Sequence, residues 1–389
     1  MSDFEKISTN WNYPTSIRFG AGRMSELASV CKELKISKPL LITDPGIAKL
    51  PMVESVLKAT RNEGISTGLF FNIKPNPTGK NVEDGLKAYR EKGYDGVIAL
   101  GGGSALDAAK AIALVSGQKQ PLWEFEDIGD NWSKADPNGI APIIAVPTTA
   151  GTGSEVGRAS VIVQEETHTK KIIFHPKMLP TVVISDPELT IGLSPGLTAA
   201  TGMDALSHCL EAYCAPGYHP MADGIAVEGI RLIAEWLPVA YKDGQNLEAR
   251  SHMLVAASMG ATAFQKGLGA MHSLAHPLGA IYDVHHGLLN AILMPYVLEF
   301  NRSAIEAKMT LLASYLNLAN PSFETFIKLV LKLRKEFNMA SNLSELGIDD
   351  SLADEIAQKA INDPTASTNP TPMKIKDMKQ VFMSALVGK

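Results

Sequence analysis

Cysteine is scarce in this sequence, which contains three among 389 residues: Cys31, Cys209 and Cys214. Their odd number and irregular spacing argue against a cysteine-ligated metal cluster. We interpret Cys209 and Cys214 as buried core thiols, since cysteine packs as a small hydrophobic residue. So few cysteines suit a reducing compartment, and we expect a cytoplasmic protein.

Long apolar runs and runs of one charge sign are also missing. No stretch of about 18 apolar residues occurs, so we expect no transmembrane helix. The polar start MSDFEKISTNWNYPTSIRFG lacks the apolar core of a signal peptide. The net charge is −5 and no Lys/Arg run occurs. We therefore expect neither nucleic acid nor an anionic membrane surface as the main partner.

Strands and helices alternate through the first half of the chain. Apolar strands are predicted at 38–44, 65–73, 95–100 and 141–146, and helices at 51–64, 81–94 and in the later part of 95–117. Apolar strands separated by helices indicate a parallel sheet that is covered on both faces.

The second half of the sequence is helical throughout. Ser194 and Pro195 have the residue types of an N-cap and a first helical position, and further helical segments follow between Gly- and Pro-bearing breaks. A length of 389 residues favours two domains. We predict a Rossmann-like α/β domain at 1–190 and an all-α domain at 191–389.

A glycine-rich turn follows the predicted strand that ends at Leu100. Its residues are Gly101, Gly102, Gly103 and Ser104. Glycines let a pyrophosphate approach the backbone closely, and the amides and dipole of the next helix attract it. The turn lacks the G-x-G-x-x-G pattern, so a tight βα turn without a ligand is the alternative to a dinucleotide site.

Four other residues are candidate cofactor contacts. Thr148 and Thr149 follow the strand at 141–146 and either line the ribose or nicotinamide or belong to a plain connector. Asp44 follows an early strand, where a carboxylate accepts hydrogen bonds from the adenosine ribose and repels the 2′-phosphate of NADP; we therefore favour NAD. An ordinary turn acid is the alternative. Asp107 is either a further contact or a first-turn acid favoured by the helix dipole.

Histidine is concentrated between Leu268 and Asn290, a stretch that holds four of the nine in the chain. His272 and His276 are four residues apart, and Asp204 and His208 repeat that spacing, so each pair shares one helix face. Apolar neighbours indicate that both pairs are buried, which is costly without a shared purpose. We predict a divalent-metal site, suited to Fe²⁺, Zn²⁺ or Mn²⁺. A hydrogen-bonded core network is the alternative.

The ordered motifs resemble those of the group III, iron-containing alcohol dehydrogenases, whose members include lactaldehyde reductase, 1,3-propanediol dehydrogenase and butanol dehydrogenases. The resemblance rests on NPT at 76–78, GGGSALDAAKAIA at 101–113, PTTAGTGSE at 147–155, DPELT at 186–190, GMDALSHCLEAY at 202–213, the histidine stretch and TNP at 368–370. It implies an N-terminal dinucleotide-binding α/β domain and a C-terminal helical, metal-binding catalytic domain.

The resemblance also implies roles for single residues. The metal ligands would be Asp204, His208, His272 and His286. His276 would lie beside the nicotinamide without ligating, and we take it as the catalytic residue that relays a proton. His285 competes with His286, but the family's ligand directly precedes the glycine, and this selects His286.

The implied activity is the NAD-dependent interconversion of a primary alcohol and its aldehyde by hydride transfer, with the metal activating the alcohol or carbonyl oxygen. Four protein ligands leave room for substrate only beyond tetrahedral coordination, which favours Fe²⁺ over Zn²⁺. The expected partners are a small alcohol or aldehyde and further copies of the chain, as a dimer or larger. Two alternatives are an NAD- and metal-dependent lyase of the dehydroquinate synthase type and a non-catalytic NAD-binding assembly module.

Overall fold

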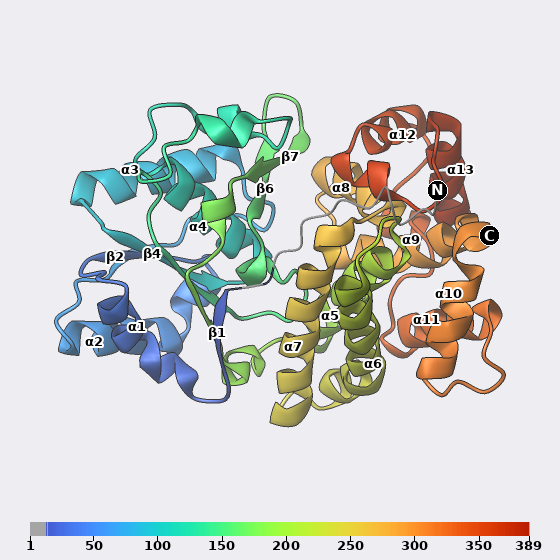
Figure 1. The fold of residues 1–389 in the computed structure, drawn as a ribbon, viewed down its shortest axis with the longest axis horizontal. Helices are drawn as coiled ribbons and strands as arrows, with labels where there is room; N and C mark the ends of the chain where they lie inside the picture. Colours follow the sequence, from blue (N-terminus) through green and yellow to red (C-terminus); the bar gives the residue numbers. More distant parts are fainter. Residues whose placement is uncertain (1–12, 14, 389) are drawn as a thin grey trace, which may run out of the picture. The chain divides into compact units, whose positions relative to one another are not determined.

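The structure, a computed structural model, describes residue 13 and residues 15–388. The chain forms two compact units, Pro14–Gly192 and Leu193–Lys389, and Tyr13 groups with the second of them (Figure 1). Within the described residues, no helix combines the length and the apolar character that a membrane crossing needs.

Six parallel strands form the sheet of the Pro14–Gly192 unit. In sheet order they are β1 (Ser16–Phe19), β8 (Val182–Ser185), β5 (Ile143–Pro147), β4 (Gly96–Gly101), β2 (Pro39–Ile42) and β3 (Gly68–Phe70). The chain runs outward from β2 to β3 and then returns to place β4 on the other side of β2. Open α/β sheets bind ligands outside the carboxyl ends of their strands at such a reversal. The segments after β2 and β4 meet this condition.

Alternate residues of the strands face two separate cores. Leu40 and Ile42 pack in one core with helices α3 (Gly79–Lys92) and α4 (Gly103–Val115). Leu41 packs in the other with α1 (Leu27–Glu33) and α2 (Pro51–Asn62). Burial on both faces explains why these strands have continuous apolar sequences rather than alternating ones.

Several strands differ from the sequence prediction. The strand predicted at 65–73 is shorter, because only Gly68–Phe70 pairs at the sheet edge, and short edge strands limit unwanted pairing. The strands β1 and β8 were not predicted. An antiparallel pair, β6 (Ala159–Gln164) and β7 (Thr169–Phe174), lies outside the main sheet.

The Leu193–Lys389 unit is helical throughout its described residues. Its α-helices are α5 (Pro195–Cys214), α6 (Pro220–Lys242), α7 (Leu247–Ala263), α8 (Ala270–Tyr282), α9 (His286–Phe300), α10 (Arg302–Tyr315), α11 (Phe323–Glu336), α12 (Ala353–Ile361) and α13 (Ile375–Val387). As predicted, Ser194 caps α5, since its hydroxyl oxygen accepts a hydrogen bond from the Leu197 amide at 3.3 Å. The predicted fold class, α/β followed by all-α, is confirmed.

Helix α5 is buried along almost its whole length and contacts α6, α7 and α9. Glycines allow this close packing: a Cβ on Gly229 would lie 2.7 Å from the Cys209 sulfur, and one on Gly260 would lie 3.1 Å from the Cβ of His208. Burial raises the pKa of the Cys209 thiol to about 12, as for an inert core cysteine. Close contacts with three helices therefore fix the position of α5 and of its polar residues Asp204 and His208.

Candidate metal centre and nucleotide loops

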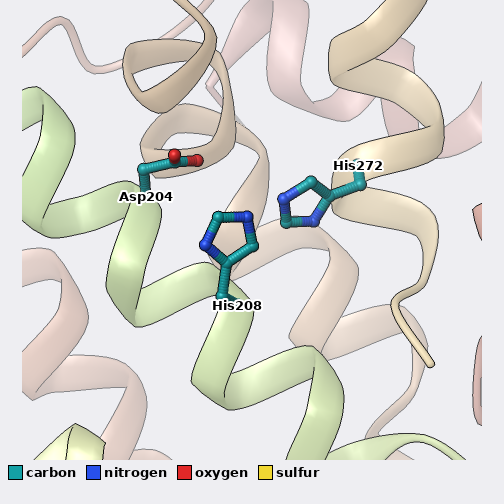
Figure 2. Close-up of side chains that lie close together, drawn as sticks. All are labelled: Asp204, His208 and His272. Carbon is teal, nitrogen blue, oxygen red and sulfur yellow. The ribbon is translucent and has the colours of Figure 1, made fainter. Parts of the chain in front are cut away.

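Three buried side chains from two helices point toward one small space (Figure 2). Asp204 and His208 lie one turn apart on α5, and His272 lies in the first turn of α8. One carboxylate oxygen or ring nitrogen of each residue lies within 4.8 Å of the corresponding atoms of the other two. Each residue is at most 5% exposed. One carboxylate and two imidazoles at this spacing form a set of donors that a divalent cation can share.

His286, at the start of α9, lies beside the same space. Its Nε2 atom is 3.6 Å from Oδ1 of Asp204, and its ring centroid is 5.2 Å from that of His272. Gly287 permits this approach, since a Cβ there would lie 2.1 Å from the carbonyl oxygen of Ala200 on α5. The structure therefore brings the four predicted ligands together, and their role as ligands stays a prediction.

The variant Gly287→Ala is expected to push α9 away from α5 and to destabilise the protein by about 1–3 kcal/mol. Thermal unfolding and metal content measure the two effects. Gly224→Ala is the matched control, because a Cβ at this helical glycine of α6 meets no atom within 4 Å. If Gly287→Ala unfolds at the same temperature as Gly224→Ala, the close approach of the two helices is not what positions His286.

Asn290, which the sequence analysis did not single out, lies at the centre of the cluster. It is one turn beyond His286 on α9, and its Nδ2 atom is 2.9 Å from Oδ1 of Asp204, 3.1 Å from Nε2 of His286 and 3.3 Å from Nε2 of His272. Its Oδ1 atom is buried and has no hydrogen-bond partner among the described residues. Asn290 thus has a nitrogen near three ligand-type atoms and a buried oxygen without a partner, and this combination fits a site that an additional cation completes.

Two buried carboxylates hold the histidines of α8 through their Nδ1 atoms. Oε2 of Glu211 is 2.6 Å from Nδ1 of His272, and Oδ2 of Asp363 is 2.7 Å from Nδ1 of His276. A proton on Nδ1 leaves the lone pair on Nε2, the atom that would bind a metal or accept a proton. Each carboxylate therefore selects a tautomer.

The pKa values of His272 and Asp363 are shifted by these ion pairs. Burial lowers the pKa of His272, but the Glu211 carboxylate outweighs it, and the net pKa is above the usual value. Burial raises the pKa of Asp363, but His276 and the Thr365 hydrogen bonds leave it below the usual value. In His272 and in Asp363, the ion pair therefore favours the charged form of the side chain.

His276 and His285 occupy different surroundings. The His276 ring stacks on that of His286 with centroids 5.4 Å apart, and His276 is largely buried. It is not a member of the three-residue group formed by Asp204, His208 and His272. His285 is the exposed N-cap residue of α9. Of the two adjacent histidines, His286 is the one that lies beside the cluster.

The glycine turn and the threonine loop of the Pro14–Gly192 unit lie side by side. The Thr148 amide donates a hydrogen bond to the carbonyl oxygen of Gly101 at 2.9 Å. A Cβ on Gly102 would lie 3.2 Å from the side chain of Thr149. Gly101 has a φ of +151°, which side-chain-bearing residues rarely adopt. Gly102 is also the N-cap of α4, whose first amides have no side-chain cap and suit an anion.

Asp44 lies beside this turn. A Cβ on Gly101 would be 3.8 Å from Oδ2 of Asp44. The other carboxylate oxygen, Oδ1, accepts hydrogen bonds from the amides of Gly46 and Ile47 at 2.8 and 3.0 Å. The Asp44 side chain therefore stabilises the turn, as the alternative interpretation expected, and its contact with the adenosine ribose stays a prediction.

Two other predicted cofactor contacts have partners within the protein. The Ser104 hydroxyl donates to the carbonyl oxygen of Pro75. Asp107 accepts hydrogen bonds from the Ser154 hydroxyl and, at 2.8 Å, from the Val161 amide. Asp107 also lies 3.3 Å from the ammonium of Lys110, whose pKa burial lowers. Asp107 ties α4 to β6 in this way, and the cofactor contacts of Ser104 and Asp107 stay predictions.

A glycine turn at the reversal of a parallel sheet, together with a buried carboxylate–imidazole cluster on a helical unit, fits an enzyme that uses a dinucleotide and a metal ion, such as a metal-dependent dehydrogenase. The sequence model described as "Iron-containing alcohol dehydrogenase" matches residues 14–187, and that described as "Fe-containing alcohol dehydrogenase family, C-terminal" matches residues 198–386. The chain belongs to the iron-containing alcohol dehydrogenase family. It is an oxidoreductase, a metal-dependent alcohol dehydrogenase.

Individual relatives match over their whole length. The 4-hydroxybutyrate dehydrogenase of Cupriavidus necator is 37% identical over 96% of this chain and 99% of its own. A crystal structure of a 1,3-propanediol oxidoreductase is 35% identical, with a TM-score of 0.92 over 98% of this chain and 100% of its own. Sulfoacetaldehyde reductase from Bifidobacterium kashiwanohense, solved with NAD⁺, is 26% identical, with a TM-score of 0.88 over 98% of this chain and 100% of its own. The predicted family and activity are confirmed, and we set aside the lyase and the assembly module.

Proposed function

We propose that this protein interconverts a small primary alcohol and its aldehyde by hydride transfer to or from NAD, with Fe²⁺ as the working cation. The observation that carries the proposal is the buried cluster of Asp204, His208 and His272 in a chain of the iron-containing alcohol dehydrogenase family. The units Pro14–Gly192 and Leu193–Lys389 would be its dinucleotide-binding and catalytic domains.

The donor set supports a divalent cation held by Asp204, His208, His272 and His286. One carboxylate and three imidazoles suit Fe²⁺, Zn²⁺ and Mn²⁺. When bound, the cation would supply Lewis-acid chemistry at the alcohol or carbonyl oxygen. Because substrate would be an additional ligand, a metal that expands beyond tetrahedral coordination is preferred, and Fe²⁺ meets this need better than Zn²⁺.

The protein's own residues would position the reacting groups and carry the proton. The cluster is buried, which keeps water away and strengthens every charge interaction within it. His276, with Nδ1 2.7 Å from Oδ2 of Asp363, would adopt the tautomer in which Nε2 accepts a proton. We assign His276 the relay of the alcohol proton toward solvent, and the reverse transfer during aldehyde reduction.

The nucleotide would bind on the Pro14–Gly192 unit. The residues assigned to it are Gly101, Gly102, Gly103 and Ser104 for the pyrophosphate, Thr148, Thr149 and Asp107 for further contacts, and Asp44 for the adenosine ribose. Support comes from the reversal of strand order beside the turn and from a relative of similar fold solved with NAD⁺. The Asp44 carboxylate would repel a 2′-phosphate, so NAD is preferred over NADP.

The relatives support a proposal for the substrate, and the composition supports one for the partners and the cellular location. The names of the three relatives refer to small molecules with a terminal alcohol or aldehyde. We assign this chain a substrate of the same size, no nucleic-acid or membrane partner, a cytoplasmic location and a homo-oligomeric state of two or more copies.

Oxidation of NADH and NADPH by a panel of short aldehydes tests the proposal. The protein is first stripped of metal and then resupplied anaerobically with Fe²⁺, Zn²⁺ or buffer alone. The expected result is turnover that needs metal, is fastest with Fe²⁺ and prefers NADH. Equal turnover with buffer alone would refute the metal requirement, and no turnover with any aldehyde would refute the assigned reaction.

A further inference from the structure

Glu211 is a buried carboxylate that the proposed reaction does not use directly. It lies on α5, seven residues after Asp204 and three after His208, so the three side chains share one face of the helix. Glu211 is 4% exposed. A carboxylate buried to this degree requires partners that compensate for its lost hydration.

Both carboxylate oxygens of Glu211 are engaged by the first turn of α8. Oε2 is 2.6 Å from Nδ1 of His272, and Oε1 accepts a hydrogen bond from the Met271 amide at 2.7 Å. The N-cap residue of α8 is Gly269, which has no side chain with which to cap the helix. A Cβ on Gly269 would lie 3.0 Å from Oε1 of Glu211, so glycine leaves room for the remote cap.

We propose that Glu211 is the positioning residue of the metal centre. Its carboxylate fixes His272 in the tautomer that presents Nε2 and binds the first turn of α8 to α5, so that Asp204, His208 and His272 are held in register before a cation arrives. The inference rests on the proposed ligand role of His272.

Only a carboxylate can make both contacts. Glu211 can accept a hydrogen bond at each oxygen, one from a backbone amide and one from an imidazole. Glutamine at this position has a single oxygen, so its amide group would face either the Met271 N–H or the His272 Nδ1–H, donor against donor. The variant Glu211→Gln therefore loses either the helix cap or the tautomer while its volume is unchanged.

Metal affinity is the direct readout, measured with Zn²⁺ by competition against a chromophoric chelator. Glu211→Gln is expected to bind Zn²⁺ about 10–100-fold more weakly than the unmodified protein. Asn369→Ala is the matched control, because Oδ1 of Asn369 accepts from the Ala270 amide at 3.2 Å at the same helix end. This control is expected to unfold at a lower temperature but to keep its affinity within about threefold of the unmodified protein.

The outcomes separate this inference from the proposed function. Unchanged affinity in Glu211→Gln together with lost affinity in His272→Ala overturns the role of Glu211 and leaves the ligand set standing. Unchanged affinity in His272→Ala overturns the ligand set itself. Equal weakening in Glu211→Gln and Asn369→Ala also overturns the inference, because helix capping alone would then explain both.

A second measurement needs no variant at position 211. In metal-free protein labelled with ¹⁵N-histidine, the His272 signals are those that disappear in His272→Ala. At a pH high enough to leave the His272 ring neutral, the inference predicts a proton on Nδ1 and a bare Nε2. A neutral ring with its proton on Nε2 would overturn it even if Glu211→Gln fails to fold.

Discussion

Alanine at position 272 is expected to remove both the bound metal and the turnover of the protein. His272 is 2% exposed, and its donor atom lies within 4.8 Å of those of Asp204 and His208. Removing the ring takes away one of the predicted imidazole ligands and leaves a cavity in its place. Oε2 of Glu211 also loses its partner. Metal content by elemental analysis and aldehyde reduction with NADH measure the two effects.

His276→Ala is the matched comparison, because His276 lies four residues further along α8. It is expected to keep its metal and to lose mainly rate, about 10²–10⁴-fold, which is the usual contribution of a positioned acid–base group. A His272→Ala protein with full metal and full activity would show that the ligand set is wrong. A metal-free His276→Ala protein would instead assign a ligand role to His276.

Asp363→Asn is expected to lower kcat by about 10²–10⁴-fold and to leave metal content unchanged. Oδ2 of Asp363 lies 2.7 Å from Nδ1 of His276, and a carboxylate there can only accept. An asparagine amide can donate to Nδ1, which favours the opposite tautomer and removes the lone pair from Nε2. Steady-state kinetics at saturating aldehyde, with metal analysis of the same sample, measure the effect.

The control for this variant is Asp349→Asn, which changes an exposed carboxylate that accepts from the Ser351 amide at 3.0 Å. It is expected to retain the turnover of the unmodified protein. Should Asp363→Asn turn over as fast as this control, then Asp363 does not govern the tautomer of a catalytic His276.

Part of the candidate site could be predicted because it depends on residues that are close in the sequence. Residues four apart on a helix lie on the same face, so Asp204 was placed with His208, and His272 with His276, once the helices themselves were predicted. The apolar strands and the glycine turn after β4 were also predicted from local sequence, the strands from their apolar runs and the turn from its consecutive glycines. Glu211 carries such a signal too, because it is the next residue on the same face of α5, but its role was not predicted.

The remaining features depend on contacts that sequence spacing does not encode. Asp363 meets His276 across 87 positions of the chain, and Asn290 meets Asp204 across 86. Only the packing of α9 against α5, with Gly287 on the carbonyl of Ala200, creates the second contact. The short edge strand β1 was missed because its four residues are largely exposed and lack an apolar run.

Anomalous X-ray diffraction at the iron edge, from crystals of the Fe²⁺-loaded protein, tests the central claim most directly. The account predicts one strong anomalous peak, in contact with a carboxylate oxygen of Asp204 and with a ring nitrogen of each of His208, His272 and His286. A peak elsewhere in the molecule, or none in protein that carries stoichiometric iron and turns over aldehyde, would contradict it.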